Sequence, residues 1–352
     1  MKKLFTPFIL LLIITFAAIH PAKAQDASSD PGAYMNVISD AETGMNKSYM
    51  AYISASAHSS RKRKIEKMRE QAIEAIQTCQ NTINYNLGPF KGDNSLRQGS
   101  LNYVGLCYKI FNDDYAHIVD MDDIAERSYD EMQAYLLLQQ ATNDTLQAAI
   151  TRVNKAQETF AAKYNVTLTS DRTELSDKMK ESNKLNEYRD KVYLIFYKCN
   201  WEDNQLTNAV NEKNVTKIEQ TRSALGKYAI EGLATLDKML GYDGDNTLVE
   251  SVKQALNFYK DEAQVQIPKV TDFFLKEENF EKLKTTMEGK SADQRTKQDI
   301  DNYNNAVNDI NASVKTYNET NSDLNNGRND VNKNYNDTEK AFIDTHTPYY
   351  KK

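Results

Sequence analysis

The residues best suited to chemistry lie in the segment NDDYAHIVDMDD, residues 112–123. Asp114, His117 and Asp120 are three positions apart, which places them on one face of a helix. Two carboxylates and an imidazole in that arrangement could hold a divalent metal ion. The competing interpretation is a solvated acidic helix end, because a di-metal helical bundle needs further Glu-x-x-His ligands and the sequence has none.

Signatures of the common enzyme classes are missing from the sequence. It contains no G-x-S-x-G, H-E-x-x-H or C-x-x-C-H, no phosphate-binding loop and no dinucleotide fingerprint. His58, His117 and His346 are far apart, and none has a Cys or Glu at ligand spacing. We therefore expect no enzymatic activity and no cofactor.

A second metal alternative is the segment GYDGDNTLVE, residues 241–250. Asp243, Asp245 and Thr247 alternate as the ligands of a calcium loop do. The pattern then fails, because Leu248 stands where the loop needs its sixth-position Gly and Gln254 where it needs its twelfth-position Glu.

The first 24 residues predict export. MKK supplies a basic start, residues 4–18 are mainly apolar, and A-K-A before Gln25 is a cleavage signal. An uncleaved membrane anchor is the alternative, but the apolar run is shorter than the ~20 residues that a span needs. We expect a signal peptide at 1–24, a mature chain without a transmembrane segment, and a location in the bacterial periplasm, at the cell surface or outside the cell.

The mature chain is acidic. Removing residues 1–24 removes three of the 44 Lys and Arg and none of the 50 Asp and Glu, which leaves 41 against 50, a net charge of −9. This balance disfavours nucleic acid as a partner. One basic run, SSRKRKIEKMR at 59–69, is typical of a charged helix face, although it could also contact anionic lipid or polysaccharide.

Three cysteines, Cys79, Cys107 and Cys199, lie among apolar neighbours on expected helices. They are interpreted as small buried hydrophobic residues. A Cys79–Cys107 disulfide across a helical hairpin is the alternative, because an odd number of cysteines in an exported chain permits one bridge and one free thiol.

A repeated phrase indicates the architecture. PFKGDNSLRQ at 89–98 returns as GYDGDNTLVE at 241–250, and in both copies a Gly precedes S/T-x-x-E/Q. That pattern predicts a turn followed by a helix with a capping box opened by Ser95 or Thr247. KIE at 64–66 returns at 217–219, and VNK at 153–155 returns at 331–333, in the same order. Chance similarity among Asn-rich and Lys-rich helices is the alternative to an internal duplication.

The offsets between the copies predict a projecting arm. They are 153 residues at KIE, 152 at GDN and 178 at VNK, so the second copy is longer by about 26 residues after its turn. Two antiparallel helices lengthened by about 13 residues each would project by roughly 20 Å. Five apolar residues are spaced to pack against the last helix: Phe273, Phe274, Leu275, Phe280 and Leu283.

The last helix carries a heptad-like pattern from residue 300 to 342. Ten of thirteen positions at alternating spacings of three and four are apolar, which predicts a coiled-coil-like seam. Asn321, and Asn143 at the matching place in the first copy, interrupt the seam and are interpreted as register-fixing residues. Arg328 lies on the same seam and is expected to extend its guanidinium to solvent.

Few glycines and prolines and a long helical periodicity predict an all-α protein of two tandem antiparallel four-helix units. The first unit is expected at 25–166 and the second, with its extended helical arm, at 167–352, divided near VTLTSDR at 166–172. The expected helices are 30–58, 62–86, 95–118, 121–165, 173–212, 215–240, 247–288 and 291–344.

The signal peptide, the tandem helical units and the Asn-rich and Lys-rich helices resemble the uncharacterised all-helical surface and periplasmic proteins of bacteria. The resemblance implies an exported helical protein and transfers no functional residue. The sequence therefore predicts a non-enzymatic interaction or scaffold protein of the cell envelope or surface, whose partner is a protein or an envelope component. The alternative is a periplasmic helical bundle that carries a ligand or metal.

Overall fold

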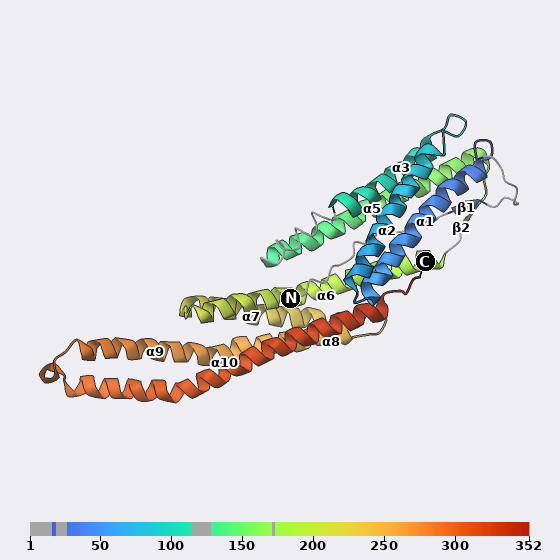
Figure 1. Cartoon of the computed structure of the whole chain (residues 1–352). Coiled ribbons are helices and arrows are strands. Elements are labelled where there is room, and N and C mark those ends of the chain that lie inside the picture. The colour runs from blue at the N-terminus through green and yellow to red at the C-terminus, as the bar shows by residue number, and fades with distance from the viewer. Residues whose placement is uncertain (1–15, 19–26, 115–127, 171–172, 352) are drawn as a thin grey trace. The chain divides into compact units, whose positions relative to one another are not determined.

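The protein is helical throughout the residues that its structure, a computed structural model, describes: 16–18, 27–114, 128–170 and 173–351 (Figure 1). One pair of three-residue strands is the exception, so the all-α prediction is confirmed. The α-helices are α1 (Pro31–His58), α2 (Lys62–Tyr85), α3 (Ser95–Tyr108), α5 (Tyr129–Tyr164), α6 (Glu174–Asn211), α7 (Val215–Leu236), α8 (Thr247–Asp261), α9 (Ile267–Glu288) and α10 (Lys297–His346). Three short elements join them: the π-helical turns η1 (Lys109–Asp114) and η2 (Glu262–Gln266), and the 3₁₀ turn η3 (Ala292–Gln294).

The two strands, β1 (Phe16–Ala18) and β2 (Leu168–Ser170), pair antiparallel with Phe16 opposite Ser170. The sequence gives no strand signal here, and β1 lies inside the expected signal peptide. Cleavage after Ala24 would therefore remove β1 and leave β2 without this partner.

Local sequence determines where several helices begin. Asp30 caps α1, because its Oδ1 accepts from the Ala33 N–H at 2.6 Å and Pro31 follows in the first turn. In the same way, Asn214 caps α7 by accepting from the Lys217 N–H at 3.0 Å. These caps explain why the predicted helix starts at 30 and 215 lie within a residue of those observed.

The chain forms two compact units. Unit 1 comprises residues 1–190 together with 343–352, and unit 2 comprises residues 191–342. The division falls inside α6, whereas the sequence break at 166–172 falls at β2. The division between the units falls inside α6 because Leu175 and Met179, near the start of that helix, belong to the core of unit 1.

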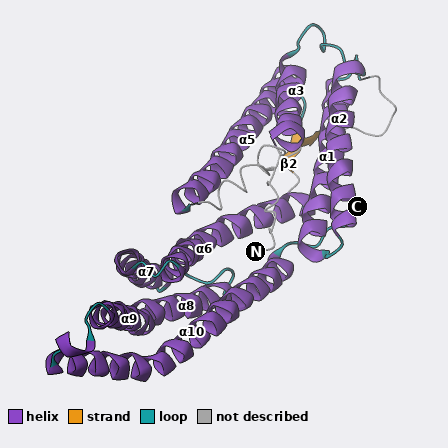
Figure 2. Ribbon diagram, turned by 60° about the vertical axis from the view of Figure 1, so that its left-hand side comes forward, coloured by secondary structure: helices purple, strands orange, loops and turns teal. Residues whose placement is uncertain are grey.

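In unit 1 each helix packs against the next one along the chain: α1 on α2, α2 on α3, and α3 on α5 (Figure 2). An aromatic cluster closes the end of the unit near the α2–α3 turn. Tyr34, Phe90 and Phe160 lie with ring centroids 5.2–5.5 Å apart, and Tyr164 lies 4.6 Å from Phe160. Offset and edge-on ring pairs of this kind contribute about 0.5–1.5 kcal/mol each beyond their buried area.

The repeated phrase folds as the same tight turn in both units. Phe90 and Asp93 exchange backbone hydrogen bonds at 2.8 and 2.9 Å, and Tyr242 and Asp245 exchange theirs at 2.9 and 3.0 Å. The two central residues have positive φ, 49° and 84° in unit 1 and 49° and 88° in unit 2, with Gly second in each pair. This is the geometry of a type I′ turn.

The expected capping boxes are wrong, because the turn carboxylate does the capping. Asp93 Oδ1 accepts from the Ser95 N–H at 2.9 Å, and Asp245 Oδ1 accepts from the Thr247 N–H at 2.8 Å. Hydrogen bonds from Lys163 and Ser95 hold the pKa of the Asp93 carboxyl well below its usual range. The Asp of the GDN phrase is therefore the residue that joins turn to helix.

In unit 2, α7 packs against α8, η2 and α9. Figure 1 shows α9 and α10 running side by side beyond the turn that joins α6 to α7. The buried core includes Leu225, Val252 and Leu256, which are inaccessible to solvent. Both units contain a π-helical turn at the end of their third helix, η1 after α3 and η2 after α8.

The buried face of α10 coincides with the predicted seam only in part. Between 303 and 324 the buried residues are Ala306, Ser313, Thr320 and Leu324, whereas Val314 is exposed. Tyr303 and Tyr317 of the predicted seam lie against the Phe280 and Phe273 rings of α9, and Leu324 of the seam is buried.

Candidate functional site

The predicted metal residues fall mostly outside the described residues. Asp114 ends η1, but its side chain is not described, and His117 and Asp120 lie in 115–127. Within the described part of the chain no three His, Cys, Asp or Glu side chains are grouped to hold a metal ion. The Asp114, His117 and Asp120 site therefore stays a prediction.

The three cysteines carry free thiols and are buried. Burial raises the pKa of each thiol, in the case of Cys199 to about 12. Thiols held so far in the neutral form are poor nucleophiles. The interpretation of Cys79, Cys107 and Cys199 as small core residues agrees with this environment.

A buried charged cluster lies in the core of unit 2 and joins α6, η2 and α10. Arg328 Nε donates to Asp203 Oδ1 at 2.8 Å, and a second guanidinium nitrogen donates to Glu262 Oε1 in a short contact. Asp203 is 3% exposed and Glu262 is 0% exposed. The expectation that Arg328 reaches solvent is wrong, because two carboxyl groups hold it inside the bundle.

Burial determines the protonation of the cluster. It raises the pKa of Glu262 far above its ordinary value, and the neighbouring Asp203 carboxylate raises it further. Burial raises the pKa of Asp203 as well, and Arg328 opposes that shift. Burial therefore favours the protonated forms of the two carboxyl groups, whereas the Arg328 guanidinium favours their charged forms.

Amides and a phenol extend this polar layer across the unit. Asn200 Nδ2 donates to the Tyr259 hydroxyl at 2.9 Å and to Asn332 Oδ1 at 2.8 Å. These bonds connect α6, α8 and α10. Hydrogen-bonded polar layers of this kind fix helix register.

Sequence reasoning missed this cluster, although a signal was present. The repeat offsets of 153, 152 and 178 pair Asp203 with Met50, Glu262 with Ile110, and Arg328 with Ile150. Met50, Ile110 and Ile150 are all buried. At these offsets, three apolar core residues of unit 1 correspond to an acid, an acid and a base in unit 2, which indicates a buried ionic group.

Unit 1 has a different buried acid, Glu42 of α1. It is 0% exposed, and neither carboxyl oxygen has a hydrogen-bond partner among the described residues. Burial raises its pKa to about 7, against a smaller lowering by the nearby Ser100 hydroxyl. Glu42 thus titrates near neutral pH, in a core where its charged form has no counter-charge of its own.

The arm, defined as residues 275–305, has no buried residue. At its base Phe273 stacks on Tyr317 with ring centroids 4.2 Å apart, and farther out Phe280 lies 5.8 Å from Tyr303. Leu275 is 51% exposed, which corrects the expectation that it packs against α10. The Phe280–Tyr303 pair therefore holds the two helices of the arm together, and the Phe273–Tyr317 pair holds them together at its base.

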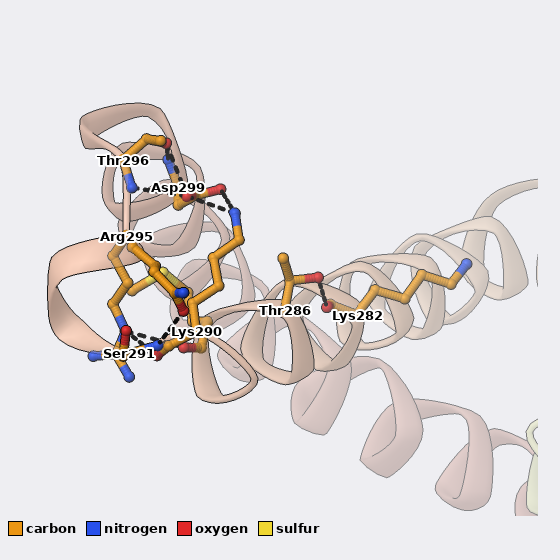
Figure 3. Close-up of polar contacts among 9 residues, drawn as sticks. Lys282, Thr286, Lys290, Ser291, Arg295, Thr296 and Asp299 are labelled. Carbon is orange, nitrogen blue, oxygen red and sulfur yellow. Dashed lines mark hydrogen bonds and ion pairs between the residues drawn. The ribbon is translucent and has the colours of Figure 1, made fainter.

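The tip of the arm is ordered by its own polar contacts (Figure 3). Lys290 Nζ donates to both oxygens of Asp299 at 2.7 and 2.8 Å, and Asp299 also accepts from the Thr296 N–H at 2.9 Å. Arg295 Nε donates to the carbonyls of Met287 and Lys290 at 3.0 and 3.1 Å and so caps the end of α9. The tip presents a fixed polar surface.

No helix among the described residues is long and apolar enough to cross a bilayer. Comparison with known proteins finds no family model, no curated protein and no solved structure that matches the chain. The function therefore has to be argued from this molecule alone.

Proposed function

We propose that the protein is an exported, non-enzymatic interaction or scaffold protein of the bacterial cell envelope or surface, and that the arm is its contact with a partner. The observation that carries the proposal is that α9 continues to Glu288 and α10 starts at Lys297, so both helices extend into residues 275–305 without burying a residue there. Helical propensity alone rarely stabilises so short a pair of helices in water. An extension that adds nothing to the core, yet has an ordered tip, is suited to meeting another molecule.

The two units support an origin by duplication, with the first copy at 25–166 and the second at 167–352. Both contain the type I′ turn at the GDN phrase and a π-helical turn one helix later. η1 begins at Lys109 and η2 at Glu262, which are 153 residues apart, close to the sequence offset. Since the arm is the part of the second copy without a counterpart, it is the part that closing a bundle does not require.

Deleting residues 278–299 and joining the helices by a short turn tests the role of the arm. We expect helicity to fall only by the residues removed, cooperative unfolding to persist, and binding to envelope preparations of the source bacterium to disappear. A matched variant keeps both helices and replaces only 289–296 with a Gly-Asn turn, which separates a contact at the tip from one along the helices. Unfolding of unit 2 by the deletion, or binding that survives it, would refute the proposal.

A metal-carrying bundle is the second candidate, favoured by the position of Asp114 at the end of a π-helical turn, since such turns often occur at functional sites. Metal analysis of the purified protein tests it. A stoichiometric metal that is lost in the Asp114→Ala, His117→Ala variant would support this candidate.

A further inference from the structure

A cluster of unpaired cations lies where α1 connects to α2. Arg61, Lys62, Arg63, Lys64 and Lys67 are all exposed. None of them forms an ion pair or side-chain hydrogen bond with any residue that the structure describes. Some exposed lysines elsewhere have carboxylate partners, as when Lys282 contacts Glu278 at 2.6 Å. In a chain with a net charge of −6, the four consecutive cations Arg61, Lys62, Arg63 and Lys64, followed by Lys67, are a local concentration of positive charge.

The start of α2 makes this arrangement less favourable still. The positive end of a helix dipole favours Asp or Glu in the first turn, whereas α2 has no acid there and no side chain that caps it. Lys62, Arg63 and Lys64 occupy the first turn instead. Charges that oppose the local preference of a helix are expected where function, rather than folding, sets the sequence.

The C-terminal segment brings an aromatic residue and another cation to the same end of unit 1. His58, three residues before Arg61, contacts Asp344 Oδ1 through Nδ1 at 2.8 Å and the Thr347 carbonyl through Nε2 at 3.0 Å. The ring of Tyr349 lies 5.1 Å from the His58 ring and is 56% exposed.

Two further contacts hold this segment in place. Tyr350 donates its N–H to Ser54 Oγ at 2.9 Å, and Lys178 Nζ donates to the Tyr349 carbonyl at 2.8 Å. Lys351, next along the chain, is exposed, with its Nζ 5.5 Å from the Tyr349 ring centroid. A fixed, exposed tyrosine beside a cation therefore lies against His58, three residues before the first of the five cations.

We propose that this basic patch, Arg61–Lys67 with Tyr349 and Lys351, docks the protein on an anionic phospholipid surface. Clusters of Lys and Arg bind acidic headgroups, and tyrosine favours the boundary between headgroups and acyl chains. Nucleic acid is the less suitable polyanion, because the protein has a negative net charge and its surface outside the patch would repel a long polyanion. The proposed contact is made by the side chains of the patch. It does not depend on the arm.

Co-sedimentation of the full protein with vesicles tests the patch. Vesicles of phosphatidylglycerol mixed with phosphatidylcholine are compared with vesicles of phosphatidylcholine alone, at low and high salt. The test variant carries Arg61→Gln, Lys62→Gln, Arg63→Gln and Lys64→Gln. Because each cation near an anionic surface strengthens binding severalfold, we expect the variant to bind at least tenfold more weakly, and the wild-type protein to be released by salt.

A matched variant removes four cations that do have carboxylate partners and lie outside the arm: Lys155→Gln, Lys227→Gln, Lys315→Gln and Lys333→Gln. It changes the net charge equally and should bind as the wild-type protein does. Tyr349→Ala with Lys351→Gln should weaken binding severalfold while circular dichroism stays unchanged.

Three results would overturn the proposal: no preference of the wild-type protein for the anionic vesicles, equal loss in both four-site variants, or full binding by the patch variant. Dextran sulfate serves as a polysaccharide probe. If it binds through the same residues while the vesicles do not bind, the partner is an acidic polysaccharide and the lipid assignment is wrong.

Discussion

Arg328 Nε lies 2.8 Å from Asp203 Oδ1 in the core of unit 2, although 125 residues separate them in the chain. With Glu262 the two side chains tie α6, η2 and α10 together at one level of the bundle. Breaking a buried ion pair by removing one partner is costly because the remaining charge stays buried. Replacing the whole group with apolar side chains of similar volume is often neutral or stabilising.

The first prediction follows from the difference between removing one charged partner and replacing the whole group. Arg328→Ala leaves two buried carboxyl groups without their cation, so we expect the free energy of unfolding of unit 2 to fall by about 3–5 kcal/mol. Urea denaturation followed by circular dichroism measures it.

The matched variant takes the residues of unit 1 that the repeat offsets pair with these three: Asp203→Met, Glu262→Ile and Arg328→Ile, after Met50, Ile110 and Ile150. Its stability should lie within about 1 kcal/mol of the wild-type value or above it. If this variant is as unstable as Arg328→Ala, the three positions are not equivalent in the two copies.

The second prediction concerns Glu42 and pH. Its pKa rises from 4.5 to about 7 on folding, so the folded state keeps a proton that the unfolded chain has already lost. The stability due to that proton is complete below pH 4.5 and is lost as pH rises through 7. With 1.36 kcal/mol per pH unit, the loss is about 3 kcal/mol across this window.

Glu42→Gln cannot ionise, so this part of the pH dependence should disappear when unfolding is followed from pH 4.5 to 8. Glu74→Gln, an exposed site on α2, should keep the wild-type profile. Equal profiles for the wild-type protein and Glu42→Gln would show that the carboxyl does not titrate in this range.

The third prediction concerns the arm. Tyr303 packs on Phe280 beyond the last buried residue of α9, whereas Tyr317 packs on Phe273 at the base. Tyr303→Ala should therefore speed amide hydrogen exchange in 278–299 without lowering the unfolding midpoint. Tyr317→Ala should lower the midpoint too. An unchanged exchange rate in Tyr303→Ala would mean that the aromatic pair does not hold the arm together.

Local chemistry made the helices and the two turns predictable. Asp30 and Asn214 mark helix starts by side-chain type, and the GDN phrase marks a turn because Gly92 and Gly244 supply positive φ. The capping carboxylates of Asp93 and Asp245 were missed because S/T-x-x-E/Q is the stronger sequence pattern. Each Asp lies two residues before the Ser or Thr of that pattern and accepts from the backbone N–H of that Ser or Thr.

The buried polar groups could not be predicted from one helix at a time. On its own helix Arg328 faces the core, where a long side chain usually extends to solvent. The partners of Arg328, Asp203 and Glu262, come from α6 and η2, and only the tertiary structure brings these elements to α10. The buried face of α10 was predicted only in part, because the heptad pattern includes the buried Leu324 and Phe342 but leaves out Ala306 and Ser313, which are buried although they are small.

The final prediction compares two glycines in helix interiors. Replacing Gly by Ala inside a helix normally stabilises by about 0.5–1 kcal/mol. Gly44 of α1 has nothing within 4 Å of the position that a Cβ would take, so Gly44→Ala should show that gain. At Gly327 of α10 the added Cβ would overlap the ring of Phe258, whose rigid side chain must move.

We therefore expect Gly327→Ala to lower the free energy of unfolding by about 1–3 kcal/mol, the usual cost of overpacking, despite the better helix propensity of Ala. The double variant Gly327→Ala, Phe258→Leu should recover part of the loss, because the smaller side chain leaves room for the methyl group. If Gly327→Ala is stabilising like Gly44→Ala, then α10 and α8 do not approach as closely as the ring contact requires.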